Sequence, residues 1–133
     1  MQKVVLDTNI IISAAISDKG NPFAIINLVS EGKLTMYFNA AILDEYADVL
    51  SRDKFNLSVT KQKAVIDKIK EIGRIIVPNV STIPLPDESD RKFYDTAKVA
   101  NAYLITGNTK HYPEEPHILT PAQFAAVTYA ENG

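Results

Sequence analysis

The sequence contains no cysteine, and only 2 of its 133 residues are histidine. The absence of cysteine excludes disulfides, thiolate zinc sites and cysteine nucleophiles. His111 and His117 lie in a loop-like stretch without a recognisable ligand spacing, so we expect both to be surface-loop residues. We therefore expect any metal site in this chain to be built from oxygen ligands.

The chain also lacks a strong net charge and a long apolar run. Its formal net charge of -2 neither indicates nor excludes a nucleic-acid binder, because a local basic patch can coexist with an acidic cluster. No segment is long enough to span a bilayer, and Asp7 interrupts the only candidate. The first residues lack the layout of a signal peptide, so we expect a cytoplasmic protein with no membrane partner.

The overall composition of the chain is that of an ordinary globular domain. Hydrophobic residues make up 46% of the chain and charged residues 23%, and 133 residues are enough for one hydrophobic core. No internal repeat, low-complexity stretch or linker divides the sequence. We therefore predict a single domain over residues 1–133.

Short β-branched or alternating runs alternate with helical patterns along the whole chain. The patterns predict strands at 3–7, 33–38, 74–78, 103–108 and 118–120, and helices at 8–17, 23–32, 39–52, 60–73, 90–102 and 121–130. Asn21 and Asn39 are predicted N-caps, and Gly32 is predicted to end the second helix. This alternation indicates an α/β fold with a parallel sheet covered by helices on both faces.

Three polar side chains fall where parallel sheets bind ligands, beyond the carboxyl ends of the strands. Asp7 ends the first strand, Asn108 follows the fourth, and Asp90 starts the helix before it. An ionised Asp7 inside the first core element is costly unless it is paired or binds a metal. Asp90 shares a helix face with Phe93 and Ala97, which places it at the rim of the core. Carboxylates are also favourable at any helix N-terminus, so the pattern leaves both interpretations of Asp90 open.

The middle helix carries three acids with different expected exposures. Glu45 falls at the edge of the apolar stripe formed by Ile42 and Tyr46. Asp44 and Asp48 fall on the opposite face, where we expect them to be solvated. Glu45 is therefore the candidate of the three for a functional role, although glutamates at such boundaries are common without one.

The stretches VVLDTNIIISA, ILDEYADVL, DESDRKFYDTAKVANAYLITGN and ILTPAQF, in this order, resemble the PIN-domain family. The similarity is greatest to the branch of toxin components of toxin–antitoxin systems related to the VapC ribonuclease toxins. It implies a PIN-like three-layer sandwich with a parallel central sheet of about four to five strands flanked by helices. It also implies an endoribonuclease that depends on Mg²⁺ or Mn²⁺, with an RNA substrate, a cognate antitoxin protein as a partner, and a homodimer.

Motif by motif, the resemblance assigns catalytic and metal-binding roles to Asp7, Glu45 and Asp90. The fourth family position, commonly an acid, is Asn108 here, an amide that can bind a hard cation but brings no charge. Asp95 stands where the branch also tends to carry an acid, so it is a further candidate ligand.

Thr8, Asn9, Ser13 and Thr106 are expected to support this site. Asn9 and Ser13 lie one turn apart on one helix face, where they could hold Asp7 or a metal-bound water. Helix capping and local backbone bonding explain Thr8, Asn9 and Ser13 equally well.

The residue types suit metal-dependent phosphodiester hydrolysis. Crowded carboxylates repel one another, a divalent ion removes that conflict, and a metal-activated water can attack the phosphodiester. Two alternatives stay open. One is a catalytically weak PIN-like module that binds RNA or protein, which Asn108 favours. The other is an Asp-based phosphotransfer or phosphatase domain built on Asp7, although Asn9 stands where dehalogenase-like enzymes need a second Asp.

Overall fold

The structure is a computed structural model that describes residues 2–132, with side chains described for residues 2–127. Met1 and Gly133, the two ends of the predicted domain, lie outside the described residues. The strands are β1 (Gln2–Leu6), β2 (Leu34–Phe38), β3 (Arg74–Ile75), β4 (Tyr103–Ile105) and β5 (Ile118–Leu119). The helices are α1 (Thr8–Ile16), α2 (Asn21–Ser30), α3 (Ala40–Leu50), α4 (Val59–Ile72), α5 (Arg91–Ala100) and α6 (Pro121–Asn132). Short 3₁₀ turns are η1 (Asp53–Phe55), η2 (Glu88–Asp90) and η3 (Thr109–His111).

The five strands form one parallel sheet in the order β3-β2-β1-β4-β5. β1 lies at the centre, where Val4 pairs with Met36 of β2 on one side and with Tyr103 of β4 on the other. The chain first adds strands on one side of β1 and later on the other. The carboxyl ends of β1 and β4 therefore flank a topological switch point, the usual ligand position in such sheets.

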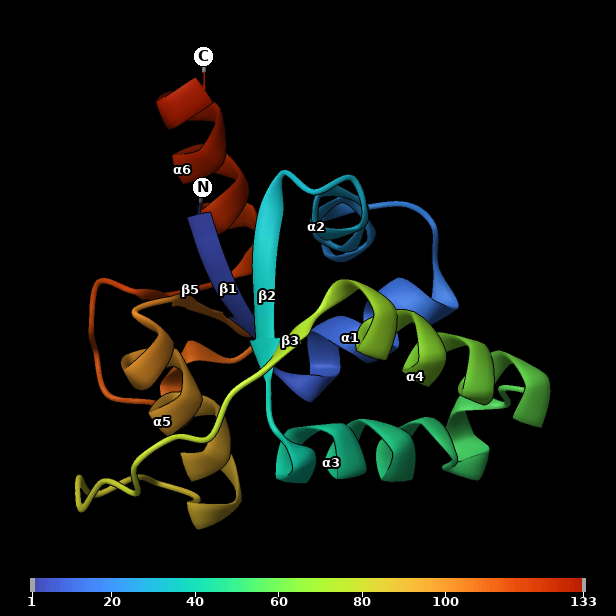
Figure 1. Cartoon of the computed structure of the whole chain (residues 1–133), viewed down its shortest axis with the longest axis horizontal. Helices are drawn as coiled ribbons and strands as arrows, with labels where there is room; N and C mark the ends of the chain where they lie inside the picture. The colour runs from blue at the N-terminus through green and yellow to red at the C-terminus, as the bar shows by residue number, and fades with distance from the viewer. Residues whose placement is uncertain (1, 133) are drawn as a thin grey trace.

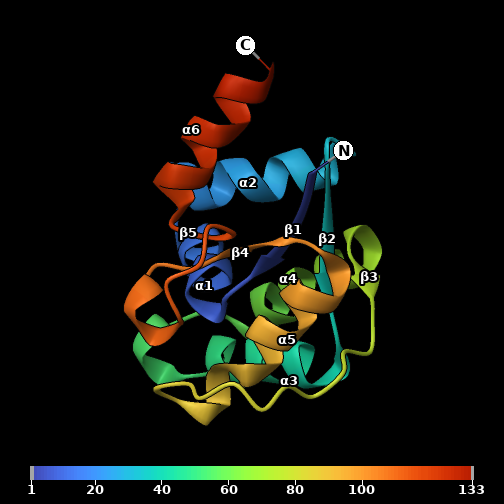
Figure 2. The ribbon, with the colours of Figure 1, turned by 90° about the vertical axis from the view of Figure 1, so that its left-hand side faces the viewer.

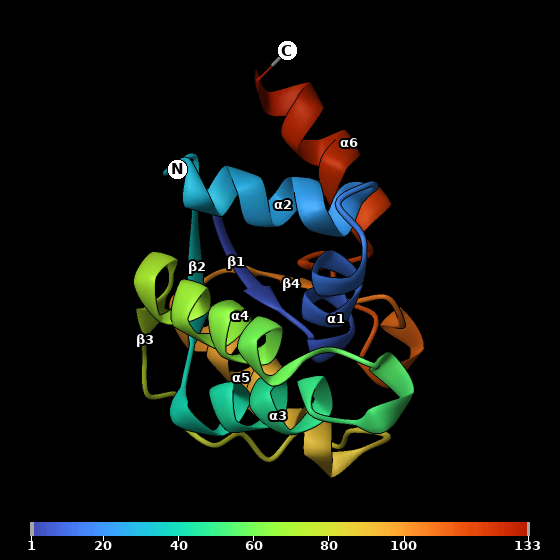
Figure 3. The ribbon, with the colours of Figure 1, turned by 90° about the vertical axis from the view of Figure 1, so that its right-hand side faces the viewer.

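Helices cover both faces of the sheet and give three layers. In Figure 1, α5 lies on one side of β1 and β2, while α1, α2 and α4 lie on the other. The two side views agree, because α5 is in front of the sheet in Figure 2 and behind it in Figure 3. The predicted α/β sandwich with a parallel central sheet is confirmed. None of the helices in the described part of the chain is long and apolar enough to cross a membrane.

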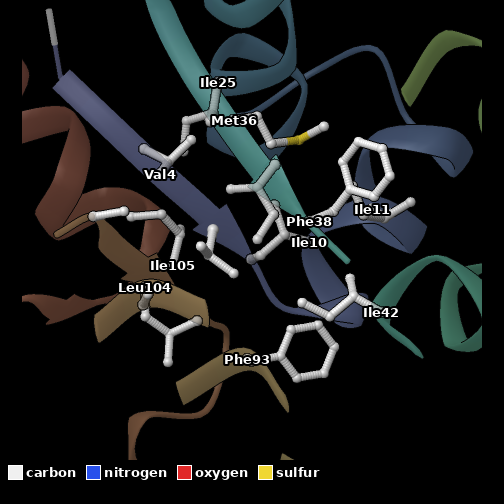
Figure 4. Close-up of a cluster of buried hydrophobic side chains, with 14 of the residues drawn as sticks. Val4, Ile10, Ile11, Ile25, Met36, Phe38, Ile42, Phe93, Leu104 and Ile105 are labelled. Atoms are coloured by element: carbon white, nitrogen blue, oxygen red, sulfur yellow. The ribbon is translucent and has the colours of Figure 1, made fainter. Parts of the chain in front are cut away.

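The central strands are buried on both faces, as a covered parallel sheet requires. Val4, Leu104 and Ile105 are fully buried, and Figure 4 shows them packed with apolar side chains from the surrounding helices. Phe93 of α5 and Ile42 of α3 meet at one end of this cluster. The core therefore fixes α3 and α5, which carry candidate site residues, against the end of β1.

The predictions for β3 and for the start of α2 need correction. The strand predicted at 74–78 is only the two residues of β3, and Pro78, at the end of the predicted range, has no N–H to donate to a ladder. The predicted cap Asn21 is the first residue of α2, and the N-cap is Gly20, with φ of 93° and no side-chain bond. By contrast, Asn39 caps α3 as predicted, because its Oδ1 accepts from Ile42 N at 2.9 Å.

The strand predicted at 103–108 ends at Ile105 for a reason that matters for the site. Gly107 N donates to Asn9 Oδ1 at 2.9 Å, and Asn108 N donates to Thr106 Oγ1 at 3.1 Å. These backbone groups therefore bond to side chains instead of to a neighbouring strand. The chain turns away from the sheet directly beside the end of β1.

Candidate active site

Asp7 is the most buried of the three predicted catalytic acids, with 6% of its surface exposed. Its Oδ1 accepts from Thr8 N at 2.7 Å, and its Oδ2 accepts from the hydroxyls of Thr106 at 2.8 Å and Tyr112 at 3.0 Å. Burial raises the pKa of Asp7, the three hydrogen bonds oppose that rise, and the charge of Glu45 adds to it. The net effect is a raised pKa, so a nearby cation would stabilise the ionised form of this carboxylate.

Glu45 reaches the same region from α3, where it is partly buried at the edge of the apolar stripe. Its Oε2 accepts a hydrogen bond from the Thr8 hydroxyl, and its Oε1 lies 2.8 Å from Lys92 Nζ. Asp44 and Asp48 are exposed, as the helical pattern predicted. Glu45 is thus the acid of α3 that the fold directs toward the end of β1.

Asp90 is the last residue of η2, directly before α5, and 9% of its surface is exposed. Its buried Oδ2 accepts no hydrogen bond among the described residues, and His111 Nδ1 lies 3.4 Å away. Burial raises the pKa of Asp90 to about 6, and the charges of Asp7, Asp87 and Glu45 add to the rise while His111 opposes it. A buried carboxylate oxygen without a donor is unusual in a folded protein and suits a cation ligand.

The three carboxylates act on one another although Asp7 directly follows β1, Glu45 lies in α3 and Asp90 in η2. Glu45 raises the pKa of Asp7, and both Asp7 and Glu45 raise the pKa of Asp90. Among the described residues, no three acidic or histidine side chains lie close enough together to hold an ion as they stand. Mutual repulsion separates carboxylates in the absence of a cation. Binding of an ion at these residues therefore requires their side chains to move toward it.

The side chain of Asn108, the predicted fourth ligand, contacts His111 and Lys110 and none of the three acids among its described contacts. Its Nδ2 lies 2.9 Å from His111 Nε2, and its Oδ1 accepts from Lys110 N at 3.3 Å, which caps η3. Its backbone N–H donates to Thr106 Oγ1, which in turn donates to Asp7, and its side chain contacts His111, whose Nδ1 lies 3.4 Å from Asp90 Oδ2. The described contacts thus assign Asn108 a structural place beside the site.

Asp95 is not brought to the other acids. It lies five residues after Asp90, and five helical steps of 100° turn a side chain by about 140°. Its Oδ2 accepts from Ser81 N at 3.1 Å, and its buried Oδ1 has no hydrogen bond among the described residues. The carboxylate therefore faces the segment that leads from β3 to η2, away from the end of β1.

The four predicted supports divide into two groups. Thr8 and Thr106 donate to the site carboxylates, as already described. Asn9 instead accepts from Gly107 N, and a Cβ at residue 107 would lie only 3.1 Å from Asn9 Oδ1. Ser13 is exposed, and its hydroxyl makes none of the described bonds to the acids. The Asn9 side chain links the turn after β4 to α1. Ser13 makes none of the described contacts in the site.

A family model described as PIN domain matches residues 3–110, which include all three acids and their hydroxyl donors at residues 8 and 106. The chain belongs to the PIN-domain family. The resemblance that the motifs indicated is confirmed, and PIN domains are generally nucleases.

Two further comparisons extend this result. The PIN domain is 32% identical over 109 residues to the uncharacterized protein MJ1680 of Methanocaldococcus jannaschii, a match that spans 80% of this chain and 70% of that protein. Its fold is similar to a chain in the crystal structure of VapBC2 from Rickettsia felis bound to a DNA fragment from their promoter. That match has a TM-score of 0.60 at 18% identity and covers 90% of this chain and 97% of that one. At this identity the likeness concerns the fold alone.

Sequence reasoning missed three side chains around the acids of this PIN domain. Lys92 pairs with Glu45, Tyr112 donates to Asp7, and His111 approaches the third acid although it is exposed as predicted. Burial raises the pKa of Tyr112, and so does the Asp7 charge, which keeps its hydroxyl protonated as a donor. A local signal existed for Lys92, which follows the third acid by two residues. None existed for Tyr112, whose partner lies 105 residues away.

Proposed function

We propose that this PIN domain is a metal-dependent endoribonuclease that uses Mg²⁺ or Mn²⁺. The observation that carries the proposal is the coupled set of Asp7, Glu45 and Asp90, in which burial and like charge raise the pKa of Asp7 and of Asp90. Perturbed carboxylates at strand ends are typical of functional sites. Carboxylate oxygens are the ligands that hard divalent cations prefer, and the buried Oδ2 of Asp90 accepts no hydrogen bond among the described residues, with His111 Nδ1 3.4 Å away.

The side chains of the protein would have distinct tasks in this chemistry. When bound, the cation would neutralise charge on a phosphodiester and lower the pKa of an attacking water. Thr106 and Tyr112 fix the orientation of Asp7, and Thr8 ties Glu45 to the start of α1. Such outer contacts orient metal ligands and are worth roughly 10–100-fold in metal affinity.

The biological role that we propose is that of a toxin component with a cognate antitoxin, acting on RNA in the cytoplasm as a homodimer. Its support is the motif set of the toxin branch together with the fold shared with the VapBC2 structure of Rickettsia felis. Expression of the protein should arrest growth, and the Asp7→Asn variant should not. Co-expression of a small protein from the adjacent gene should relieve the arrest if that gene encodes the antitoxin.

A second candidate function is a module that binds RNA or protein without cutting it. The observation in its favour is Asn108, whose side chain bonds to His111 and the backbone instead of adding a charge to the acids. Calorimetric titration with Mn²⁺ separates the two functions, because a binding module without a working site should take up the ion poorly. Phosphotransfer through Asp7 has no such support, since both oxygens of this carboxylate accept hydrogen bonds in a buried position.

The direct test is cleavage of single-stranded RNA by the purified protein. Mg²⁺ or Mn²⁺ should support cleavage, and EDTA should abolish it. Asp7→Asn should lower the rate by about 10²–10⁴-fold, the range expected for loss of a site-orienting group. Asp44→Asn is the matched control, because Asp44 is exposed on α3 beside Glu45. Undiminished cleavage by Asp7→Asn would reject metal catalysis through this residue.

A further inference from the structure

Lys92 forms an ion pair with Glu45, one of the three acids Asp7, Glu45 and Asp90 that make up the acidic cluster. It is the second residue of α5, and 20% of its side chain is exposed. Its Nζ lies 2.8 Å from Glu45 Oε1, donates a hydrogen bond to the Ser89 carbonyl oxygen, and lies 5.3 Å from the centroid of the Phe93 ring. These contacts hold the ammonium group at the cluster, in contrast to a lysine that is free to move in solvent.

The position of Lys92 changes the charge that the cluster presents to metal ions. When the three carboxylates are ionised, they and the ammonium group together carry a net charge of -2 (3 negative and 1 positive). One divalent cation brings this sum to zero. A second would leave two excess positive charges next to an ammonium, in a partly buried place where like charges repel strongly. The charge balance therefore suits one ion.

Two neighbouring residues do not alter this count. Asn108 supplies no carboxylate, and its amide is engaged with His111 and the Lys110 backbone. Asp87 is exposed and its carboxylate accepts from Ser89 N at 2.9 Å, so it faces solvent at the turn before α5. Neither residue offers the extra buried negative charge that a second divalent ion would need.

We propose that Lys92 supplies the second positive charge of this site, so that the PIN domain works with a single divalent cation. The ammonium group pairs with Glu45 and offsets one of the three negative charges, and it positions that carboxylate against the Thr8 hydroxyl. This inference rests on the proposed function, since it concerns how the same acids hold a metal.

The test is the stoichiometry of Mn²⁺ binding, measured by calorimetry and by the electron paramagnetic resonance of the bound ion. The wild-type protein should bind one Mn²⁺ per chain, with the spectrum of an isolated ion. Lys92→Met should gain a second, weaker binding event with exchange coupling between the ions. It should also bind the first ion on the order of tenfold more tightly, because a nearby positive charge is lost. Lys92→Arg keeps the charge and should bind one ion.

Lys98→Met is the matched control. Lys98 lies on the same helix and forms a similar ion pair, with Nζ 2.7 Å from Glu115 Oε1, but its partner is not one of the three acids. This variant should bind one Mn²⁺ with unchanged affinity. A change equal to that of Lys92→Met would mean that overall charge, and not the place of Lys92, sets the stoichiometry, and would overturn the inference.

The wild-type protein alone already decides the main point, whether or not Lys92→Met folds. Two ions per wild-type chain together with RNA cleavage would overturn the single-ion inference and leave the proposed function standing. No Mn²⁺ binding and no cleavage would overturn both. One ion in the wild type and one in a folded Lys92→Met variant would show that Lys92 does not exclude the second ion.

Discussion

The raised pKa of Asp90 makes the stability of the metal-free protein depend on pH. In the folded state this pKa is about 6, against an ordinary value of 3.8, because of burial and the nearby charges of Asp7, Asp87 and Glu45. Between these two values the folded state binds more protons at Asp90 than the unfolded state does. The contribution of Asp90 to the free energy of unfolding therefore falls as the pH rises from about 4 to about 6.

This sign leads to a prediction for Asp90→Asn. In EDTA at pH 7.5, the variant should melt at a temperature roughly 5 °C above the wild type, because it removes a carboxylate that is costly to ionise. At pH 4 the two should melt together, and excess Mn²⁺ should reverse the order at pH 7.5. Thermal denaturation followed by circular dichroism measures all three. Asp87→Asn is the control, since Asp87 is exposed and its pKa is lowered by hydrogen bonds to Ser89.

Tyr112 permits a second prediction at this scale. Tyr112→Phe keeps the buried ring but removes the hydroxyl that donates to Asp7 at 3.0 Å. We expect a loss of about 1–3 kcal/mol in the free energy of unfolding and a 10–100-fold weaker affinity for Mn²⁺. Urea denaturation and calorimetry measure the two effects. Tyr103→Phe is the control, because Tyr103 packs edge-on against Phe124 and is remote from the acids in its described contacts. Equal metal affinity in both variants would contradict the role of Tyr112.

The side chain of Asn39 links the N-terminal end of α3 to the middle of α5. Asn39 caps α3 through Oδ1, and its Nδ2 donates to Thr96 Oγ1 of α5 at 2.9 Å. The cap thus links the helix that carries Glu45 to the helix that follows Asp90. The link therefore contributes, together with the core, to the relative position of Glu45 and Asp90.

Asn39→Ala should therefore affect both stability and metal binding. Loss of the cap costs about 1–2 kcal/mol, and loss of the bond to buried Thr96 adds to it. Ser58→Ala is the matched control, because Ser58 caps α4 in an exposed position without a link to another helix. It should cost about 1 kcal/mol and leave Mn²⁺ affinity unchanged. Chemical denaturation and calorimetry of both variants check this, and equal metal affinity would argue against the link.

Local sequence patterns predicted the helices, strands and caps better than the side-chain contacts between them. The buried strand before Asp7, the outward direction of Asp44 and the cap at Asn39 follow from periodicity and capping chemistry within a few residues. The bond from Tyr112 to Asp7 and the pair between Lys92 and Glu45 depend on strand order and helix packing. The place of Lys92 two residues after Asp90 is a local signal, but no short-range pattern identifies its partner or that of Tyr112. The acids and the donors Thr8 and Thr106 could therefore be nominated from the sequence, and these two pairings could not.

At the scale of the whole molecule, the three predicted metal ligands come from segments that are far apart in the chain. Asp7 directly follows β1, Glu45 lies in α3 and Asp90 in η2. An ion that binds all three therefore binds the folded state and not the unfolded chain, which stabilises the fold. At about 100 times its dissociation constant, Mn²⁺ should add about 2.7 kcal/mol to the free energy of unfolding. The melting temperature should then rise by roughly 10 °C.

Thermal denaturation across a Mn²⁺ series measures this rise, which should be absent in Asp7→Asn. Ca²⁺ should raise the melting temperature without supporting RNA cleavage, because its looser coordination positions the attacking water poorly. A melting temperature of the wild type that does not respond to Mn²⁺ would mean that these acids do not share an ion.

The distance along the chain between Asp7 and its hydroxyl partners also has a consequence during synthesis. Asp7 is made among the first residues, but Thr106 and Tyr112 follow 99 and 105 residues later. Contacts of such long range form late, after the intervening strands and helices have collapsed around them. A growing chain on the ribosome therefore carries Asp7, Glu45 and Asp90 before it can hold the first of them in place. The hydrogen bonds that orient Asp7 therefore cannot both form until residue 112 has been made.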